Sequence, residues 1–189
     1  RASPVAVAGD DAGSPALVSN GDGFVAAWSE AVNPDPDDDE QQVRLALLDR
    51  DGRRLEGGTT IRGVGPDQPA VAWTGHNYGV VWSECTDTNY EQGFVKFVRL
   101  DATGRPVGST IKMGSAMNCE SDPAIAWSGS EFGVTWTDTR VGNAEIYFAR
   151  IGADGTQRGE ELRVTVDAGH SAPSSIGWGG QDYVIVWRD

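Results

Sequence analysis

The 189-residue sequence predicts an all-β fold made of repeated units of about 50 residues. A proline-led segment recurs at Pro15, Pro69, Pro123 and Pro173, with spacings of 54, 54 and 50 residues. After a glycine-bearing turn, each is followed by a second apolar segment that ends at Trp28, Trp82, Trp136 or Trp187. No window has the 3.6-residue periodicity of an amphipathic helix, so we expect strands throughout.

Each complete unit is expected to hold four short strands. In the third unit these are residues 123–127, 132–136, 145–151 and 161–164, which are rich in β-branched and aromatic residues. The last two strands of successive units are joined by Asp51-Gly52, Thr103-Gly104 and Asp154-Gly155, which suit a turn with positive φ. Four antiparallel strands per repeat predict a β-propeller blade. Residues 1–189 then form one domain, with units at about 1–62, 63–112, 113–165 and 166–189, the last incomplete.

The strand count is uneven, because the third strand of a unit occurs only three times. Residues 5–8 are expected to be a fourth-type strand, which would run parallel to the second strand of a unit and so does not suit the vacant third place. The strand at 183–187 is therefore left with an apolar, unpaired edge. We expect that the chain is not a closed four-bladed monomer: either it belongs to a longer propeller, or a second chain completes the ring.

Composition excludes several classes of partner. The formal net charge of −13 disfavours nucleic acid and anionic membranes, which attract clustered Lys and Arg. No segment approaches the roughly 20 apolar residues of a membrane-spanning helix, so membrane insertion is not expected.

The acids are unevenly distributed over the two faces of the predicted propeller. The loops after the second and fourth strands of each unit share one face, which we call the loop face, and they contain one basic residue, Arg140. The loop face carries 16 of the 28 acids: Asp10, Asp11, Glu30, Asp35, Asp37, Asp38, Asp39, Glu40, Asp67, Glu84, Asp87, Glu91, Glu120, Asp122, Asp138 and Asp167. The opposite face, which we call the turn face, carries nine acids and five arginines: Arg50, Arg53, Arg54, Arg105 and Arg158. The loop face is expected to bind a cation, a basic protein partner or a glycan.

The candidate ligand-binding residues on the loop face are Asp35, Asp37, Asp38, Asp39, Glu40, Asp87 and Asp122. Asp35, Asp37 and Asp39 are candidate Ca²⁺ ligands, because calcium prefers several carboxylate oxygens within a small loop. The segment is not an EF-hand loop, since its sixth position is Glu40 and its twelfth is Ala46. A solvated acidic loop and a cation site of another kind both remain open.

Catalytic motifs are scarce in this sequence. His76 and His170 are the two histidines, no Gly-x-Ser-x-Gly motif occurs, and the order of residues 19–23 differs from a sialidase Asp-box. Glycoside hydrolysis needs two placed carboxylates, and 28 acids always offer a pair. We therefore predict a non-enzymatic binding or scaffolding module; the alternative is a glycan-cleaving propeller.

The segment Trp136-Thr-Asp138-Thr-Arg140-Val-Gly, with Ile-Tyr147 and then Asp-Gly155, resembles the blade repeats of secreted bacterial β-propeller proteins. The resemblance implies a secreted protein with a lectin-like, adhesive or scaffolding role. Asp138 and Arg140 are interpreted as a structural pair that holds the turn, with a ligand clamp as the alternative. The first two units depart from this motif, with Glu and Val or Glu and Thr at the matching positions.

Two further residue types have structural interpretations. Cys85 and Cys119 fall in loops of the same face at adjoining blades, so we predict a disulfide and an extracytoplasmic location. The seven tryptophans are expected to pack between neighbouring blades, with sugar stacking as the alternative.

Overall fold

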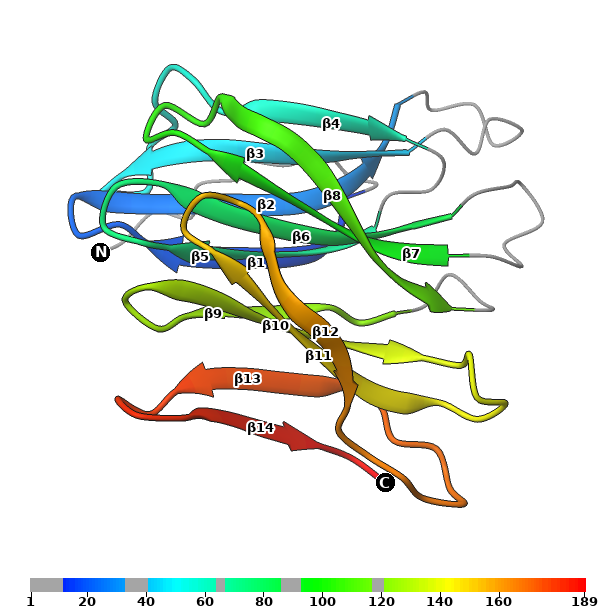
Figure 1. The fold of residues 1–189 in the computed structure, drawn as a ribbon. Coiled ribbons are helices and arrows are strands. Elements are labelled where there is room, and N and C mark those ends of the chain that lie inside the picture. The colour runs from blue at the N-terminus through cyan, green and yellow to red at the C-terminus, as the bar shows by residue number, and fades with distance from the viewer. Residues whose placement is uncertain (1–11, 33–40, 64–66, 86–92, 117–120) are drawn as a thin grey trace.

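The structure is a computed structural model that describes residues 12–32, 41–63, 67–85, 93–116 and 121–189 (Figure 1). These residues form strands and connecting loops and contain no helix. The prediction of an all-β propeller with four-stranded antiparallel blades is confirmed.

Three sheets have four strands each, paired in chain order. The first contains β1 (Gly13–Ser19), β2 (Gly23–Ala31), β3 (Gln41–Asp49) and β4 (Thr59–Gly63). The second contains β5 (Asp67–Trp73), β6 (Tyr78–Cys85), β7 (Gly93–Leu100) and β8 (Pro106–Ala116). The third contains β9 (Ala124–Trp127), β10 (Glu131–Asp138), β11 (Glu145–Gly152) and β12 (Gln157–Arg163). The last sheet contains β13 (Ser174–Trp178) and β14 (Tyr183–Trp187).

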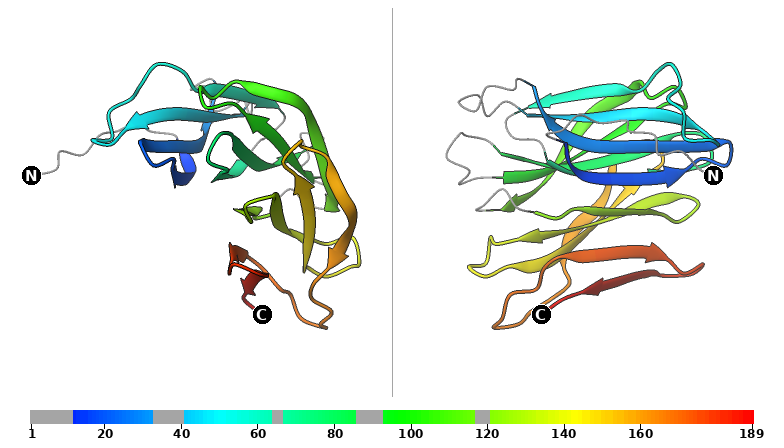
Figure 2. Two further views of the ribbon diagram at one scale, coloured as in Figure 1. Left: turned by 60° about the vertical axis from the view of Figure 1, so that its left-hand side comes forward. Right: turned by 180° about the vertical axis from the view of Figure 1, so that it is seen from behind.

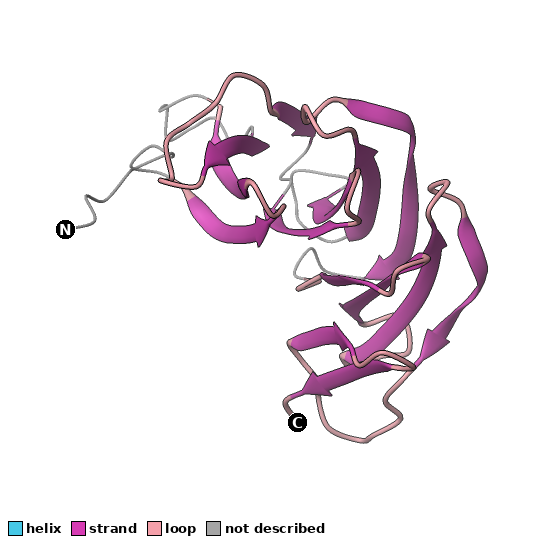
Figure 3. Ribbon diagram, turned by 90° about the vertical axis from the view of Figure 1, so that its left-hand side faces the viewer, coloured by secondary structure: helices cyan, strands magenta, loops and turns pink. Residues whose placement is uncertain are grey.

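The blades follow one another along an open arc (Figures 2 and 3). The first strands β1, β5, β9 and β13 contact one another from blade to blade, so they form the inner wall of the arc. The fourth strands β4, β8 and β12 form its outer rim. The loops after β10 and β12 lie on one side and the β9–β10 and β13–β14 turns on the other, as expected for the loop face and the turn face (Figure 1).

The one clear difference in strand bounds is β12, which begins at residue 157 rather than 161. Its residues are almost all exposed at the outer rim, so they lack the apolar alternation that marks a half-buried strand. The tight turn before it is closed by the N–H of Gly155, which donates to the carbonyl of Gly152 at 2.8 Å. The strand therefore starts directly after the turn, without an apolar residue to mark it.

Aromatic rings pack on glycines between blades. A Cβ on Gly79 would lie 2.5 Å from the Phe132 ring, and a Cβ on Gly133 would lie 2.5 Å from the Tyr183 ring. These glycines are required by close approach of the next blade. Trp28, Trp82 and Trp136 are at most 2% exposed, so the packing interpretation is correct for them. Trp178 and Trp187 in the last sheet are 36% and 42% exposed.

The two ends of the arc expose apolar side chains. Val184 and Val186 of β14 are 57% and 60% exposed, and Leu17 of β1 is 63% exposed at the other end. Within its sheet β14 pairs only with β13, so the predicted apolar edge is present. The strand expected at residues 5–8 lies outside the described residues.

Cys85 lies at the end of β6, is 4% exposed and is disulfide-bonded. Cys119 lies outside the described residues, so the Cys85–Cys119 pairing stays a prediction. Non-reduced protein is expected to yield no free thiol on titration in denaturant, and reduction is expected to release two and lower stability by roughly 3 kcal/mol. Two thiols found before reduction would contradict the pairing.

Candidate functional site

In the first three inner strands, the residue before the proline adopts an unusual backbone conformation. Ser14, Gln68 and Asp122 have φ values of 47°, 51° and 40°. These residues are 54 positions apart, so the geometry belongs to the repeat, while the side chain differs from blade to blade. Positive φ is unfavourable for a residue other than glycine and is concentrated at functional sites. We therefore consider the loop-face ends of the inner strands as the candidate functional site.

Two of these residues, together with the neighbouring Asp67, form what we call the axial carboxylate cluster: Asp67, Gln68 and Asp122. The Gln68 amide donates from Nε2 to Asp122 Oδ1 at 2.8 Å, and the Asp122 N–H donates back to Gln68 Oε1 at 3.0 Å. Asp67 Oδ1 accepts from the Ser29 hydroxyl at 2.7 Å and from the Gln68 N–H at 2.6 Å. Two half-buried carboxylates from neighbouring blades are thereby tied to one glutamine.

Unused hydroxyl groups lie beside this cluster. The N–H of Thr137 in β10 donates to the carbonyl of Ser121, the residue before Asp122, at 2.7 Å. The hydroxyl groups of Ser121 and Thr137 are buried and have no hydrogen-bond partner among the described residues. A buried polar group without a partner is unfavourable, so these two hydroxyls have hydrogen-bonding capacity to offer an internal water molecule.

A second set of acids is structural. In each sheet, the tryptophan of the second strand donates its indole Nε1–H to the carboxylate two residues later. The four pairs are Trp28 with Glu30 at 2.6 Å, Trp82 with Glu84 at 3.0 Å, Trp136 with Asp138 at 3.2 Å and Trp187 with Asp189 at 3.0 Å. This recurrence shows that the acid belongs to the blade architecture rather than to a site.

The basic residue that pairs with this acid occupies different positions in different blades. In the first two blades it comes from the third strand, as Arg44 beside Glu30 and Lys96 beside Glu84. In the third blade Tyr147 occupies that strand position, opposite Trp136. This explains why the Trp-x-Asp-x-Arg motif occurs only in the third unit.

Arg140 from the β10–β11 loop supplies the cation in the third blade. Its Nε donates to Asp138 Oδ2 at 2.8 Å, its Nη1 pairs with Glu161 at 2.8 Å, and its guanidinium stacks 4.3 Å from the Tyr147 ring centre. Glu161 also accepts from the N–H of Gly114 in β8 at 2.9 Å, so the network joins the second and third blades. Burial alone would lower the pKa of Arg140, but its hydrogen bonds to Asp138 and Glu161 outweigh burial and raise it. This geometry supports the structural interpretation of Asp138 and Arg140.

Replacing Arg140 with alanine is expected to lower the free energy of unfolding by about 2 kcal/mol, because Asp138 is fully buried and would lose its cation. Chemical denaturation measures the change. Arg150→Ala is the matched control, since Arg150 is half exposed and its nearest carboxylate contact, to Glu131, is 3.5 Å. Equal stability of the two variants would contradict a structural role for Arg140.

Glu145 at the start of β11 is a buried acid that the sequence did not single out. Its carboxylate accepts from Arg163 at 2.6 Å, from Asn143 at 3.0 Å and from the N–H of Asp167 at 3.2 Å, and also from the Thr165 hydroxyl. Burial by itself raises the pKa, but these hydrogen bonds outweigh it and hold the pKa of Glu145 at about 2. The group anchors the β12–β13 loop on the third blade.

Most of the other candidates cannot be placed. Asp122 lies in the axial carboxylate cluster, but Asp35, Asp37, Asp38, Asp39, Glu40 and Asp87 lie outside the described residues. Among the described residues, no group of three or more His, Cys, Asp or Glu side chains could hold a metal ion. In the same part of the chain, no helix is long and apolar enough to cross a membrane.

Solved structures show what this fold resembles. An α-L-arabinofuranosidase from Lactobacillus brevis matches 82% of this chain at 14% identity and a TM-score of 0.50. A GH43 endo-arabinanase from Bacillus licheniformis matches 94% at 9% identity and a TM-score of 0.54. The chain covers 54% of the first protein and 66% of the second. The sequence matches no family model and no curated protein.

These comparisons correct two predictions, that the protein is a non-enzymatic binding or scaffolding module and that it is not an enzyme. Both matched propellers are named as glycan-cleaving enzymes, so the comparisons favour the alternative prediction of a glycan-cleaving propeller. Contiguous motifs give no signal for the axial carboxylate cluster for a physical reason. In a propeller, side chains that lie close together come from the strand ends of different blades, as Asp67 and Asp122 do, and no short motif contains both.

Proposed function

We propose that this chain is part of a glycoside hydrolase that cleaves arabinose-containing glycans at the axial carboxylate cluster. The observation that carries the proposal is the pairing of Asp67 and Asp122 through Gln68 at the rim of a propeller that resembles two arabinose-releasing or arabinan-cleaving enzymes. Because fold alone does not fix function, the activity of the matched proteins enters only as support.

The chemistry requires two carboxyl groups with different tasks. One protonates the leaving glycosidic oxygen, and the other stabilises or attacks the anomeric carbon or activates a water molecule. Asp67 has one oxygen available, because both of its hydrogen bonds go to Oδ1 and Oδ2 receives none from the described residues. We assign the two tasks to Asp67 and Asp122 without ordering them.

Gln68 is a positioning residue in this proposal. Its amide group holds Asp122 from the side chain and the backbone at once, so the orientation of this carboxylate depends on the second blade. The hydroxyls of Ser121 and Thr137 are buried beneath this part of the site and do not reach the substrate in this proposal.

A substrate panel tests the proposal. We expect release of reducing ends from arabinan or of 4-nitrophenol from its α-L-arabinofuranoside, and no release from galactan, xylan or β-glucan. Folded protein that releases sugar from none of these substrates would overturn the proposed function, and cleavage of xylan or galactan alone would overturn the choice of arabinose.

A secreted location is part of the same proposal. Polymeric glycans lie outside the cell, and the disulfide at Cys85 favours an oxidising compartment. The partner is then a carbohydrate substrate.

A further inference from the structure

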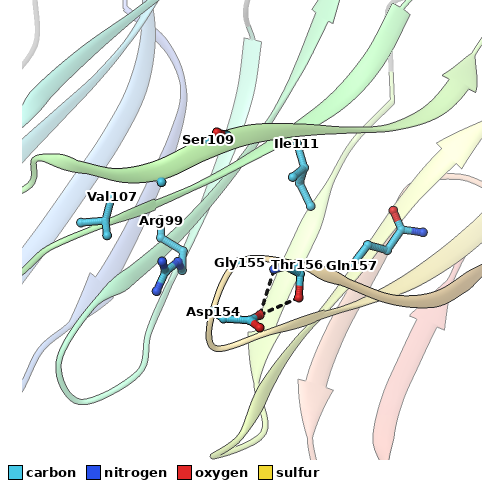
Figure 4. A pocket seen from close by; sticks show the side chains of 9 residues that line it. Arg99, Val107, Ser109, Ile111, Asp154, Gly155, Thr156 and Gln157 are labelled. Carbon is cyan, nitrogen blue, oxygen red and sulfur yellow. Dashed lines mark hydrogen bonds between the residues drawn. The ribbon is translucent and has the colours of Figure 1, made fainter.

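A groove on the turn face lies between the second and third blades (Figure 4), and no residue of the axial carboxylate cluster lines it. Its volume is about 360 Å³, within the range of small-ligand sites. One wall is β8, the other is the β11–β12 turn, and a side chain from β7 lies between them. The lining residues are Arg99, Val107, Gly108, Ser109, Ile111, Asp154, Gly155, Thr156 and Gln157.

Arg99 spans the two blades at this groove. Its Nη1 donates to the carbonyl of Ala153 at 2.7 Å. A Cβ on Gly155 would lie 2.8 Å from Arg99 Nε, so the guanidinium lies close against the turn. The side chain is thus held in place before any ligand arrives, which reduces the entropy lost on binding.

The positive charge of Arg99 is not neutralised within the described part of the chain, where it makes no ion pair. The nearby Asp154 is occupied by other groups: it accepts from the Thr156 hydroxyl at 2.7 Å and from Arg158 at 2.7 Å. A guanidinium with one of its five donors used is suited to a carboxylate, which it can bind through two parallel hydrogen bonds.

The rest of the groove suits a sugar ring. Ser109, Thr156 and Gln157 line it with hydroxyl and amide groups, while Val107 and Ile111 provide apolar surface for C–H groups (Figure 4). The turn face also holds Arg105 and Arg158, whereas the loop face is strongly acidic. The turn face is therefore less acidic than the loop face, so an anionic ligand is repelled from it less strongly, and the local positive charge in the groove comes from Arg99.

We propose that the groove binds an acidic saccharide unit, a uronate whose carboxylate pairs with Arg99. The choice of a sugar as the carrier of the carboxylate rests on the proposed glycan-cleaving function, while the charge selectivity does not. The groove would hold an acidic part of a glycan away from the site of cleavage.

Calorimetric titration at low salt tests the proposal, with glucuronate, glucose and acetate as probes. We expect glucuronate to bind at least tenfold more tightly than glucose or acetate. Binding of glucose as tight as that of glucuronate, or no binding of glucuronate at millimolar concentration, would overturn the proposal. Equal binding of acetate would reduce the groove to a carboxylate site and overturn its saccharide part.

Variants of three residues locate the binding site. Arg99→Met removes the charge and keeps much of the apolar stem, and it is expected to weaken glucuronate binding at least tenfold. Arg105→Met is the matched control on the same face and is expected to bind as the wild type does. If Arg99→Met unfolds, Gln157→Glu adds a negative charge to the groove and is expected to weaken binding with Arg99 in place. Unchanged glucuronate binding in folded Arg99→Met, or in Gln157→Glu where Arg99→Met unfolds, would overturn the proposal.

Failure of the proposed uronate site can be distinguished from failure of the proposed hydrolase function. Asp122→Asn is expected to leave glucuronate binding unchanged, and Arg99→Met is expected to leave hydrolysis of a small neutral arabinoside unchanged. Loss of hydrolysis with intact glucuronate binding would therefore affect only the axial carboxylate cluster.

Discussion

Replacing Asp122 with asparagine is expected to lower kcat/KM for arabinoside hydrolysis by roughly 10²- to 10⁴-fold. Asparagine keeps an acceptor oxygen for the amide of Gln68, but it can neither carry the negative charge nor donate a proton as a carboxylic acid. Initial rates with an aryl α-L-arabinofuranoside measure the change. Asp182→Asn, an exposed carboxylate in the turn between β13 and β14, is the matched control and is expected to retain full activity.

The division between kcat and KM distinguishes catalysis from a structural role. A carboxylate that acts in the transition state lowers kcat when removed, whereas a group that only holds the rim would change stability and substrate binding together. We expect Asp122→Asn to unfold at a denaturant concentration close to that of the wild type. Full activity of this variant would contradict the assignment of Asp122.

Replacing Glu145 with glutamine is expected to lower the free energy of unfolding at pH 7 by on the order of 3 kcal/mol. The folded protein holds the pKa of Glu145 at about 2 against an ordinary value of 4.5, so ionisation of this group favours folding. The variant also leaves Arg163 without its anion. Urea denaturation measures the loss, with Glu160→Gln, an exposed acid on β12, as the control that is expected to show little change.

The pH dependence of this effect has a definite sign. Because the folded-state pKa is lowered, the stabilisation is complete above about pH 4.5 and disappears as the pH falls towards 2. The difference in stability between wild type and Glu145→Gln is therefore expected to shrink over this range. A difference that stays constant from pH 7 to pH 3 would show that the ionised carboxylate does not supply it.

The repeat made the fold predictable. Prolines and tryptophans at fixed spacing mark the first and second strands of each blade, and close packing between blades maintains them. The polar β12 was misplaced because an exposed outer strand needs no apolar alternation. The expected strand order assigned the loops to two faces, and the acids counted on the loop face placed Asp122 among the candidates.

The candidate site was less accessible to sequence reasoning. Asp122 was one acid among 16 on its face, and nothing in its local sequence separated it from the others. Its partner Gln68 precedes the proline of the previous unit, just as Asp122 precedes Pro123. A comparison of this position between units would have identified both residues as candidates. Glu145 has no equivalent acid in the first two blades, where glutamine and phenylalanine pair with Glu30 and Glu84, so the repeat gave no signal for it.

The central claim is that the axial carboxylate cluster binds an arabinose-containing glycan, and NMR titration of the isotope-labelled wild-type protein tests it most directly. With a non-hydrolysable thio-linked arabinobiose as the probe, we expect the largest amide shifts at Gln68, Ser121 and Asp122. We expect these shifts to be lost in a Gln68→Ala, Asp122→Ala double variant. Shifts confined to the turn face, or none at saturating probe, would contradict it.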